Sequence, residues 1–224
     1  MKIEALKTDV ERYGMSQALY GLGMRAMNHA CYFHVLRGIH VAEVEAEQLR
    51  VDAGYVHRFL EDDELRRLSR DAAHDLDPRF VEEAIAGGDR CYGVLEGDTL
   101  ASYGWYATRP TPISEDLILR FSPRYAYMYK GFTHPAHRGR RLHAIGMGWA
   151  LHHLVAGGLR GLVSYVDSTN FASLKSCYRL GYRDFGSLYV LRAGTRYVLG
   201  RDRGCEAFGF RLDERSSAAS TAAA

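Results

Sequence analysis

The sequence predicts a mixed α/β (α+β) fold, with a largely antiparallel sheet flanked by helices, and three features support this. Two runs rich in strand-forming residues, 90–95 and 100–107, are joined at 96–99 by a stretch of hairpin-turn composition. An apolar run over 126–132 leads into a basic turn. A helical pattern over 144–156 follows that turn. This order of hairpin, strand, turn and helix is typical of a sheet with helices on its faces.

The first 50 residues are expected to form an extra N-terminal helical segment. Apolar residues recur at spacings of three to five from Met15 to Val35, and a second helical piece is expected over 41–49. We interpret the segment as a helical arm packed on the domain or on a second subunit. The alternative is an interfacial helix at a membrane surface, which the apolar face and nearby arginines favour.

The rest of the chain is expected to alternate between short strands and helices. One helix begins in the acidic stretch 61–64 and another at Asp77-Pro78, with Asp77 as N-cap and the glycines at 87–88 as its end. A short helix is expected over 170–180. Further strands are expected at 55–60, 117–120, 162–166, 182–191, 197–199 and 208–212. We expect three parts: a helical segment over 1–50, one domain over 51–213, and a disordered, Ser/Ala-rich tail over 214–224.

Length and composition indicate a globular protein that can bury a core. The 224 residues are 47% hydrophobic and 25% charged, and the net charge of +2 argues against a bulk nucleic-acid binder. The four cysteines are far apart, without a CxxC pair, which argues against structural zinc and a disulfide framework. The cysteine pattern also fits a reducing cytoplasm, which is the location we expect. We expect neither a signal peptide nor a transmembrane helix.

The basic turn has the composition of an anion site. Arg138, Arg140 and Arg141 surround Gly139 at the point where a strand leads into a helix. Backbone N–H groups converge at such a point, the helix dipole adds positive charge, and guanidinium groups suit phosphates. The turn is neither a Walker loop nor a GxGxxG fingerprint. It predicts a site for a phosphorylated cofactor, and the alternative is a solvated basic helix start.

A second polar element opens the short helix over 170–180. Asn170 and Ser173 stand at its start, directly after a strand, where their polar groups can face a ligand. Tyr178 lies two turns further on. A phenol has an ordinary pKa of about 10, so it is protonated at neutral pH and can donate a proton to a leaving thiolate. The alternative makes Tyr178 a core aromatic residue.

Together these two elements resemble the GNAT superfamily of acyl-CoA-dependent N-acyltransferases. In that family a strand ends in an Arg/Gln-x-x-Gly-x-Gly/Ala turn that wraps the CoA pyrophosphate. A later strand leads to Asn, a short helix with Tyr, and Gly-Phe or Gly-Tyr. Residues 134–140 look like the approach to the turn, and the resemblance covers roughly residues 89 to 200. The residues that match the second element are Asn170, Ser173, Tyr178, Gly181 and Tyr182.

The resemblance implies direct acyl transfer from acyl-CoA to an amine, without an acyl-enzyme. In this mechanism Tyr178 protonates the departing thiolate, while a base takes a proton from the ammonium. Asp167 is the first candidate for that base and Glu115 the second. The implied cofactor contacts are Phe132, Thr133, Arg138, Gly139, Arg140, Arg141, Leu142, His143, Asn170, Ser173 and Lys175.

The turn departs from the family pattern at Arg141 and His143, where the family has small residues. Side chains there narrow the approach to the backbone, and Arg141 can replace backbone contacts with a charge. The donor therefore stays open between acetyl-CoA, a longer acyl-CoA and an acyl chain on an acyl carrier protein, whose acidic surface would suit the arginines. A long donor would go with an N-acyl amino acid product or a lipid or envelope substrate. A non-catalytic acyl-CoA-binding module is the further alternative.

The resemblance implies an acceptor site shaped by residues 105–124 and the N-terminal helices, and we expect the acceptor to be a small-molecule amine. No metal is expected, because the five histidines over 134–153 lack a carboxylate or Cys at ligand spacing. Cys177 has no evident His partner in sequence, so a thiol nucleophile is not expected. The partner hypotheses are a homodimer, an acyl carrier protein and a peripheral membrane contact, without nucleic acid.

Overall fold

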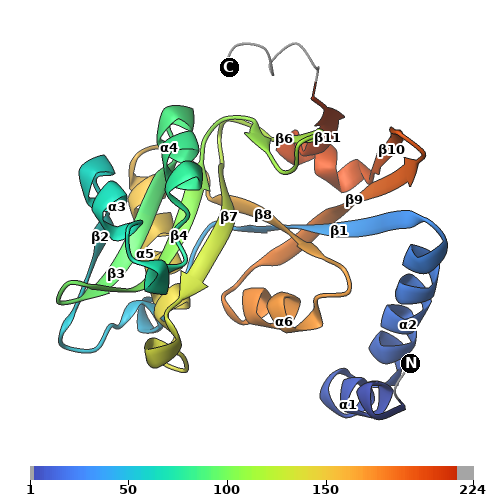
Figure 1. Cartoon of the computed structure of the whole chain (residues 1–224), viewed down its shortest axis with the longest axis horizontal. Helices are drawn as coiled ribbons and strands as arrows, with labels where there is room; N and C mark the ends of the chain where they lie inside the picture. The colour runs from blue at the N-terminus through green and yellow to red at the C-terminus, as the bar shows by residue number, and fades with distance from the viewer. Residues whose placement is uncertain (1–2, 216–224) are drawn as a thin grey trace. The chain divides into compact units, whose positions relative to one another are not determined.

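The computed structural model describes residues 3–215 and divides the chain into two compact units, which we take one at a time (Figure 1). The first unit comprises Met1–Ile39, Pro112–Arg120 and Tyr165–Ala224, and the second comprises His40–Thr111 and Phe121–Ser164. The chain passes from one unit to the other within the strands β1 (Tyr32–Val41), β5 (Thr111–Pro112) and β8 (Leu162–Asp167), and at the end of β6 (Leu117–Arg120).

The second unit is built on strands in the order β8-β7-β4-β3-β2. Neighbours from β7 to β2 are antiparallel, whereas β8 runs parallel to β7, with Ala126 opposite Leu162. The expected hairpin of β3 and β4 is confirmed, as is a largely antiparallel sheet. The strands are β2 (Tyr55–Phe59), β3 (Arg90–Glu96), β4 (Thr99–Ala107), β7 (Ala126–Thr133) and β8 (Leu162–Asp167).

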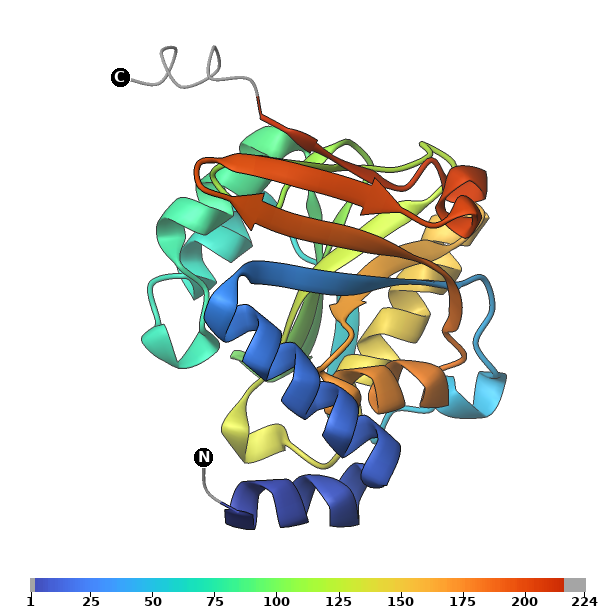
Figure 2. The ribbon, with the colours of Figure 1, turned by 90° about the vertical axis from the view of Figure 1, so that its right-hand side faces the viewer.

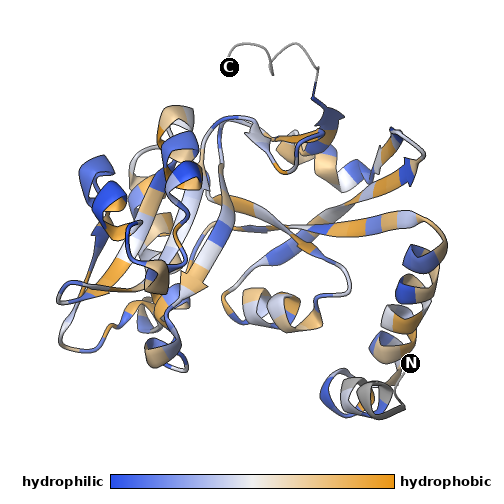
Figure 3. Cartoon of the chain, in the orientation of Figure 1, coloured by the Kyte–Doolittle hydropathy of each residue, from blue (hydrophilic) through white to orange (hydrophobic). Residues whose placement is uncertain are grey.

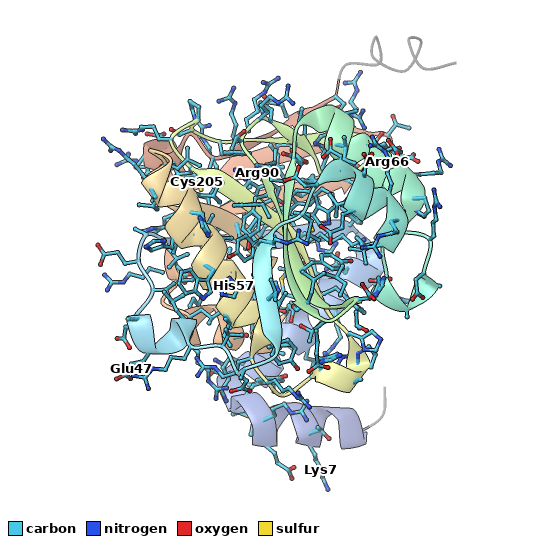
Figure 4. All side chains as sticks on the ribbon, turned by 90° about the vertical axis from the view of Figure 1, so that its left-hand side faces the viewer. Lys7, Glu47, His57, Arg66, Arg90 and Cys205 are labelled. Carbon is cyan, nitrogen blue, oxygen red and sulfur yellow. The ribbon has the colours of Figure 1, made fainter. Side chains whose placement is uncertain are left out.

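Helices cover both faces of this sheet. Side chains alternate between the faces along each strand, so β3 and β4 feed two cores. On one face, Leu142 of α5 (Leu142–Ala156) packs with Val94 and Ala101. On the other, α3 (Asp62–Leu68) and α4 (Pro78–Gly87) pack on a cluster that includes the fully buried Trp105. Figure 4 shows α5 on one side of the strands and α3 and α4 on the other. Hydrophilic residues cover much of α3 and α4 in Figure 3.

Local signals place α4 where the sequence predicts it. The Asp77 carboxylate accepts hydrogen bonds from the N–H groups of Arg79 (2.7 Å) and Phe80 (3.2 Å), which lack partners inside the helix. Pro78 occupies the first helical position. The helix ends at Gly88, whose φ of +74° lies in the left-handed region that favours glycine. The predicted caps are confirmed at both ends.

The first unit combines three helices with two groups of strands. Its main strands follow the order β10-β9-β1-β8, and β6 pairs antiparallel with β11 beside the short β5. Figure 2 shows α2 next to α6. The helices are α1 (Ile3–Tyr13), α2 (Met15–Ala30) and α6 (Phe171–Arg179). The strands are β1 (Tyr32–Val41), β5 (Thr111–Pro112), β6 (Leu117–Arg120), β9 (Arg183–Ala193), β10 (Arg196–Arg201) and β11 (Arg211–Glu214).

Short 3-10 turns complete the described residues at Ala46–Leu49, Ala72–His74, Pro135–His137 and Arg203–Phe208. Among residues 3–215, no helix has both the length and the apolar character that crossing a bilayer requires.

The expectation of helix through residue 50 is correct for α1 and α2 but wrong beyond residue 31. Residues 32–41 form β1, and only Ala46–Leu49 is helical after it, as a 3-10 turn. Phe33, Val35, Ile39 and Val41 alternate with other residues, and this two-residue period of β-branched and aromatic side chains suits a strand. The spacing that we read as helical continues into Val35 only by coincidence.

The C-terminal expectations are confirmed in part. The last strand lies at 211–214 instead of 208–212, because a 3-10 turn ends at Phe208 and Gly209 reverses the chain. Glu214, assigned to the tail, belongs to β11. Residues 216–224 lie outside the described residues. The division at residues 50 and 213, the second subunit and the membrane contact stay predictions.

His57 on β2 is held in a partly buried aromatic setting. Its Nδ1 lies 2.8 Å from the Tyr92 hydroxyl, and its ring stacks on Trp149 of α5 with 4.8 Å between centroids. Burial, and then the nearby His153, lower the pKa of His57 below its ordinary value of 6.5. The folded chain therefore favours the neutral imidazole.

This shift predicts how stability depends on pH. The unfolded chain binds a proton at His57 before the folded chain does, so the free energy of unfolding falls as pH drops through about 6.5. We expect a lower free energy of unfolding at pH 5.5 than at pH 7.5 in urea titrations. His57→Gln should flatten that slope. Equal slopes in the wild type and the variant would contradict the assignment.

Candidate functional site

The basic turn joins β7 to α5 inside the second unit, as the sequence predicts. Arg138, Arg140 and Arg141 are all exposed. Arg140 donates a 2.7 Å hydrogen bond to the hydroxyl of Tyr55 and lies 3.9 Å from the Glu96 carboxylate. Arg138 reaches back to the Thr133 carbonyl at 3.3 Å. Three guanidinium groups thus surround the start of a 15-residue helix.

Arg141 holds an unusual backbone conformation at the N-cap of α5. Its φ of +59° lies in the left-handed region, which costs a residue with a Cβ roughly 1 kcal/mol relative to glycine. Together with Gly139 at +83°, it turns the chain from β7 into α5. Arg141 therefore has a less favourable backbone conformation than glycine would have. In return it places a positive charge at the start of a helix, where the dipole also attracts anions.

Leu142 and His143 turn their side chains away from the exposed turn. Leu142 is 1% exposed and packs in the core, so only its backbone faces outward. The His143 ring lies directly over Gly131 of β7, where any added Cβ would overlap the imidazole. Burial lowers the pKa of His143 despite an opposing hydrogen bond to the Tyr103 backbone, so this histidine is neutral. Gly131 makes the space that His143 fills.

The end of β7 is held by hydrogen bonds to β4. The Phe132 carbonyl accepts the Ser102 hydroxyl at 2.7 Å, and the hydroxyls of Ser102 and Thr133 lie 3.2 Å apart. Phe132 and Thr133 are paired with Tyr103 and Ser102 in the sheet register. Hydrogen bonds to β4 therefore hold the strand end that leads into the turn. The positive charges of the turn and the start of α5 suit a diphosphate.

The second predicted element lies in the first unit, on α6. The Asn170 side chain accepts from the Ser173 N–H at 3.1 Å and caps the helix. Tyr178 and Lys175 stand on another face of α6 and share a cavity of about 740 Å³ with residues of α1 and α2, which we call the α6 cavity. Its lining is Arg12, Tyr13, Ser16, Gln17, Tyr20, Arg37, Ser168, Phe171, Leu174, Lys175, Tyr178, Arg179 and Asp184.

Tyr178 is 43% exposed in this cavity, and its hydroxyl is tied to a carboxylate. It donates to Asp184, whose two oxygens lie at 2.9 and 3.0 Å, and Arg37 lies 3.5 Å from the same carboxylate. Burial and the hydrogen bond to Asp184 raise the pKa of Tyr178 to about 12. The phenol is therefore fully protonated at neutral pH.

Asp167, the first candidate for the base, is engaged by two neighbours. One oxygen lies 2.8 Å from Nδ1 of His34 on β1, and the other accepts from the Thr169 N–H (2.9 Å) and hydroxyl (2.6 Å). Burial opposes ionisation, but these contacts prevail and lower the pKa of Asp167. The carboxylate is thus ionised and orients the His34 ring.

Glu115 lies with His34 at a second cavity of about 320 Å³, which we call the β1 cavity. Its lining is Tyr32, His34, Leu36, Ile113, Ser114, Glu115, Asp116, Leu117, Tyr165, Val190 and Tyr197. His34 and Arg37 are three positions apart on one strand, so they face opposite sides of it. The structure therefore places Glu115 and His34 at one cavity and Tyr178 and Lys175 at another, so it keeps these two groups apart.

The residues of these cavities that sequence reasoning missed include His34, Arg37 and Asp184. His34 and Asp167 are 133 positions apart, so no local pattern connects them. The alternation of side chains along β1 is a signal that the sequence contains. Once 32–41 is assigned as a strand, this alternation places His34 and Arg37 on opposite faces. Within residues 3–215, no group of three or more His, Cys, Asp or Glu side chains is arranged to hold a metal ion.

Comparisons with known proteins give several similar solved structures and one family model. Among solved structures, the chain is similar to an acetyltransferase of the GNAT family from Novosphingobium aromaticivorans, with 17% identity and a TM-score of 0.49 over 82% of this chain and 66% of that one. It is similar to a tandem GNAT protein of the clavulanic acid biosynthesis pathway, with 16% identity and a TM-score of 0.47 over 86% and 58%. A GCN5-related N-acetyltransferase-like protein from Streptococcus suis shows 12% identity and a TM-score of 0.48 over 75% and 67%.

This chain spans 66%, 52% and 58% of the first three solved chains that it matches. No curated protein matches the sequence. The sequence model of the acetyltransferase (GNAT) family matches residues 54–182, which is more than half of the 224 residues and includes the turn, Asn170 and Tyr178. The chain belongs to the GNAT acetyltransferase family.

Proposed function

We propose that the protein is an N-acyltransferase that moves an acyl group from acyl-CoA to a small-molecule amine by direct attack. The observation that carries the proposal is the turn between β7 and α5, with three exposed arginines at a helix start, inside the region that the family model matches. Acyl-CoA would be the co-substrate, supplying a thioester carbonyl and a thiolate leaving group.

The turn would hold the diphosphate of this co-substrate. Backbone N–H groups at the start of α5 and the charges of Arg138 and Arg141 suit that anion, while Arg140 is already tied to Tyr55. Asn170, Ser173 and Lys175, at the start of α6 in the first unit, stay predicted contacts of the cofactor. The buried Leu142 and the inward His143 would contribute through their backbone.

Tyr178 would hold the proton that the departing thiolate takes up. Its hydroxyl is protonated at neutral pH and opens into the α6 cavity. The hydrogen bond to Asp184 would orient the Tyr178 hydroxyl, and the departing thiolate would then compete with Asp184 for the hydroxyl proton. Asp167 and Glu115 stay predicted bases, because the β1 cavity that His34 and Glu115 line is separate from the α6 cavity that Tyr178 lines. At the β1 cavity, Asp167 orients the ring of His34.

A longer donor, carried on CoA or on an acyl carrier protein, is the second candidate. The observation that favours it is the pair of departures in the turn, Arg141 at φ +59° and His143 over Gly131, which alter a turn that glycine or alanine forms elsewhere in the family. Exposed arginines also suit an acidic carrier surface. A cytoplasmic location, the homodimer and the binding-module alternative stay predictions.

Replacing Arg141 by glycine should separate backbone strain from charge. Arg141→Gly relieves the left-handed conformation, so we expect the free energy of unfolding to rise by about 1 kcal/mol. The same change removes a charge from the turn, so the Kd for CoA should rise roughly tenfold in calorimetric titration. Arg138→Ala, whose backbone is extended, should weaken CoA binding without gaining stability. Unchanged CoA affinity in both variants would argue against a diphosphate at this turn.

Removing the Tyr178 hydroxyl should slow acyl transfer without abolishing binding. Tyr178→Phe is expected to lower kcat on the order of 100-fold, with little change in KM, because proton donation is lost and the cavity keeps its shape. Thiol release from acetyl-CoA, with an acceptor chosen from an amine panel, measures this. Tyr189→Phe is the matched control, since Tyr189 also donates to a carboxylate, that of Asp202, at 2.9 Å. Equal kcat in the wild type and both variants would exclude Tyr178 as the acid.

A further inference from the structure

The α6 cavity combines an apolar floor with a rim of cations. The residues that α6 contributes are Phe171, Leu174, Lys175, Tyr178 and Arg179, which stand at i, i+3, i+4, i+7 and i+8 and therefore form one stripe. Aromatic rings from α1 and α2 face this stripe. Its volume of about 740 Å³ falls within the range of about 300–1,000 Å³ that is typical of small-molecule sites.

The rim carries more positive than negative charge. Arg12, Arg37, Lys175 and Arg179 line the cavity, against a single carboxylate, Asp184. Arg37 shares that carboxylate with Tyr178. The other three cations have no carboxylate within 4.0 Å among the residues whose side chains are described. Three of the four charges therefore face the cavity without a counter-ion among the described side chains.

The N-terminal helices contact α6 and the residues just before it at two places. The rings of Tyr13 and Phe171 lie 5.4 Å apart between centroids. The hydroxyls of Tyr20 and Ser168 lie 2.8 Å apart. A Cβ added to Gly21 would stand 3.5 Å from the Phe171 ring, so α2 approaches α6 closely there. The N-terminal helices thus form one wall of a built cavity.

We propose that the α6 cavity binds an amphipathic anion: an apolar or aromatic body that lies on Tyr13, Phe171 and Leu174 and ends in a carboxylate or phosphate. Guanidinium and ammonium groups suit such an anion, and aromatic surfaces suit the body. Where this ligand is a substrate, the inference rests on the proposed acyl transfer, since Tyr178 stands in the same wall. The binding itself does not depend on that activity.

Three probes separate the parts of this recognition in titration calorimetry of the full chain. Dodecanoate has a tail and a negative charge, dodecylamine has the same tail with a positive charge, and inorganic phosphate has charge without a tail. We expect saturable binding of dodecanoate, with a Kd at least tenfold lower than that of either other probe. Equal binding of dodecanoate and dodecylamine, or no binding of dodecanoate, overturns the proposal.

Two variants locate the site. Arg12→Gln combined with Lys175→Gln should raise the Kd for dodecanoate about tenfold or more, because two cations leave the rim. Arg79→Gln combined with Arg196→Gln changes the net charge equally at exposed sites outside the cavity and should leave that Kd unchanged. Ser16→Trp should fill the cavity and abolish binding, with an unchanged far-ultraviolet circular dichroism spectrum as the check on folding. Equal affinity in the rim and control variants contradicts the assigned site.

The outcome is distinguishable from the fate of the proposed activity. Binding of dodecanoate without acyl transfer supports the cavity and counts against the enzyme. Binding of CoA without binding of dodecanoate supports the proposed co-substrate and counts against the cavity. In an active enzyme, competition by dodecanoate against the acyl donor would identify the ligand as the acyl chain, whereas competition against the amine would identify an acceptor that carries an anion. Either pattern supports the cavity.

Discussion

The two-residue period of β1 decides how the first unit is organised. Tyr32, His34 and Leu36 line one cavity, and Arg37, at an odd spacing from them, lines the other. A shift of one residue would exchange the two sets, and it would take His34 from Asp167 and Arg37 from Asp184. The backbone hydrogen bond from Ser168 to Val35, at 2.8 Å, helps to hold this register. Both candidate proton-transfer groups depend on it.

Much of the fold follows from local signals. The hairpin of β3 and β4, the Asp77 cap of α4 and the Asn170 cap of α6 each rest on residues within a few positions of one another, and the structure confirms them. The segment around β1 could not be predicted this way. Its apolar spacing continued the pattern of α2, and only pairing with distant strands distinguishes strand from helix there.

The parts of the candidate site whose residues are close together in the sequence were predictable. The turn from Arg138 to His143 and the helix from Asn170 to Tyr178 were found because strand, turn and helix follow one another. The partners of these residues were not predictable, since Asp167 meets His34 and Gly131 makes room for His143 only through tertiary packing. The side-chain direction of Leu142, into the core, also depends on which face of α5 meets the sheet. The spacing of residues in the sequence therefore predicts which positions belong to the site, whereas tertiary packing determines where their side chains point.

The stacking of His57 on Trp149 should make the tryptophan fluorescence of the second unit depend on the protonation of histidine. The chain has two tryptophans, and the other, Trp105, is fully buried among aromatic and apolar side chains. A protonated imidazole in contact with an indole quenches its emission more strongly than a neutral one, through electron transfer from the excited ring. Trp149 also donates its indole N–H to the Leu49 carbonyl at 2.9 Å, which fixes its orientation on the imidazole. The emission of Trp149 should therefore respond to the protonation of the histidines around it: His57 is stacked on it, and the His152 and His153 rings lie 5.8 and 6.5 Å away between centroids.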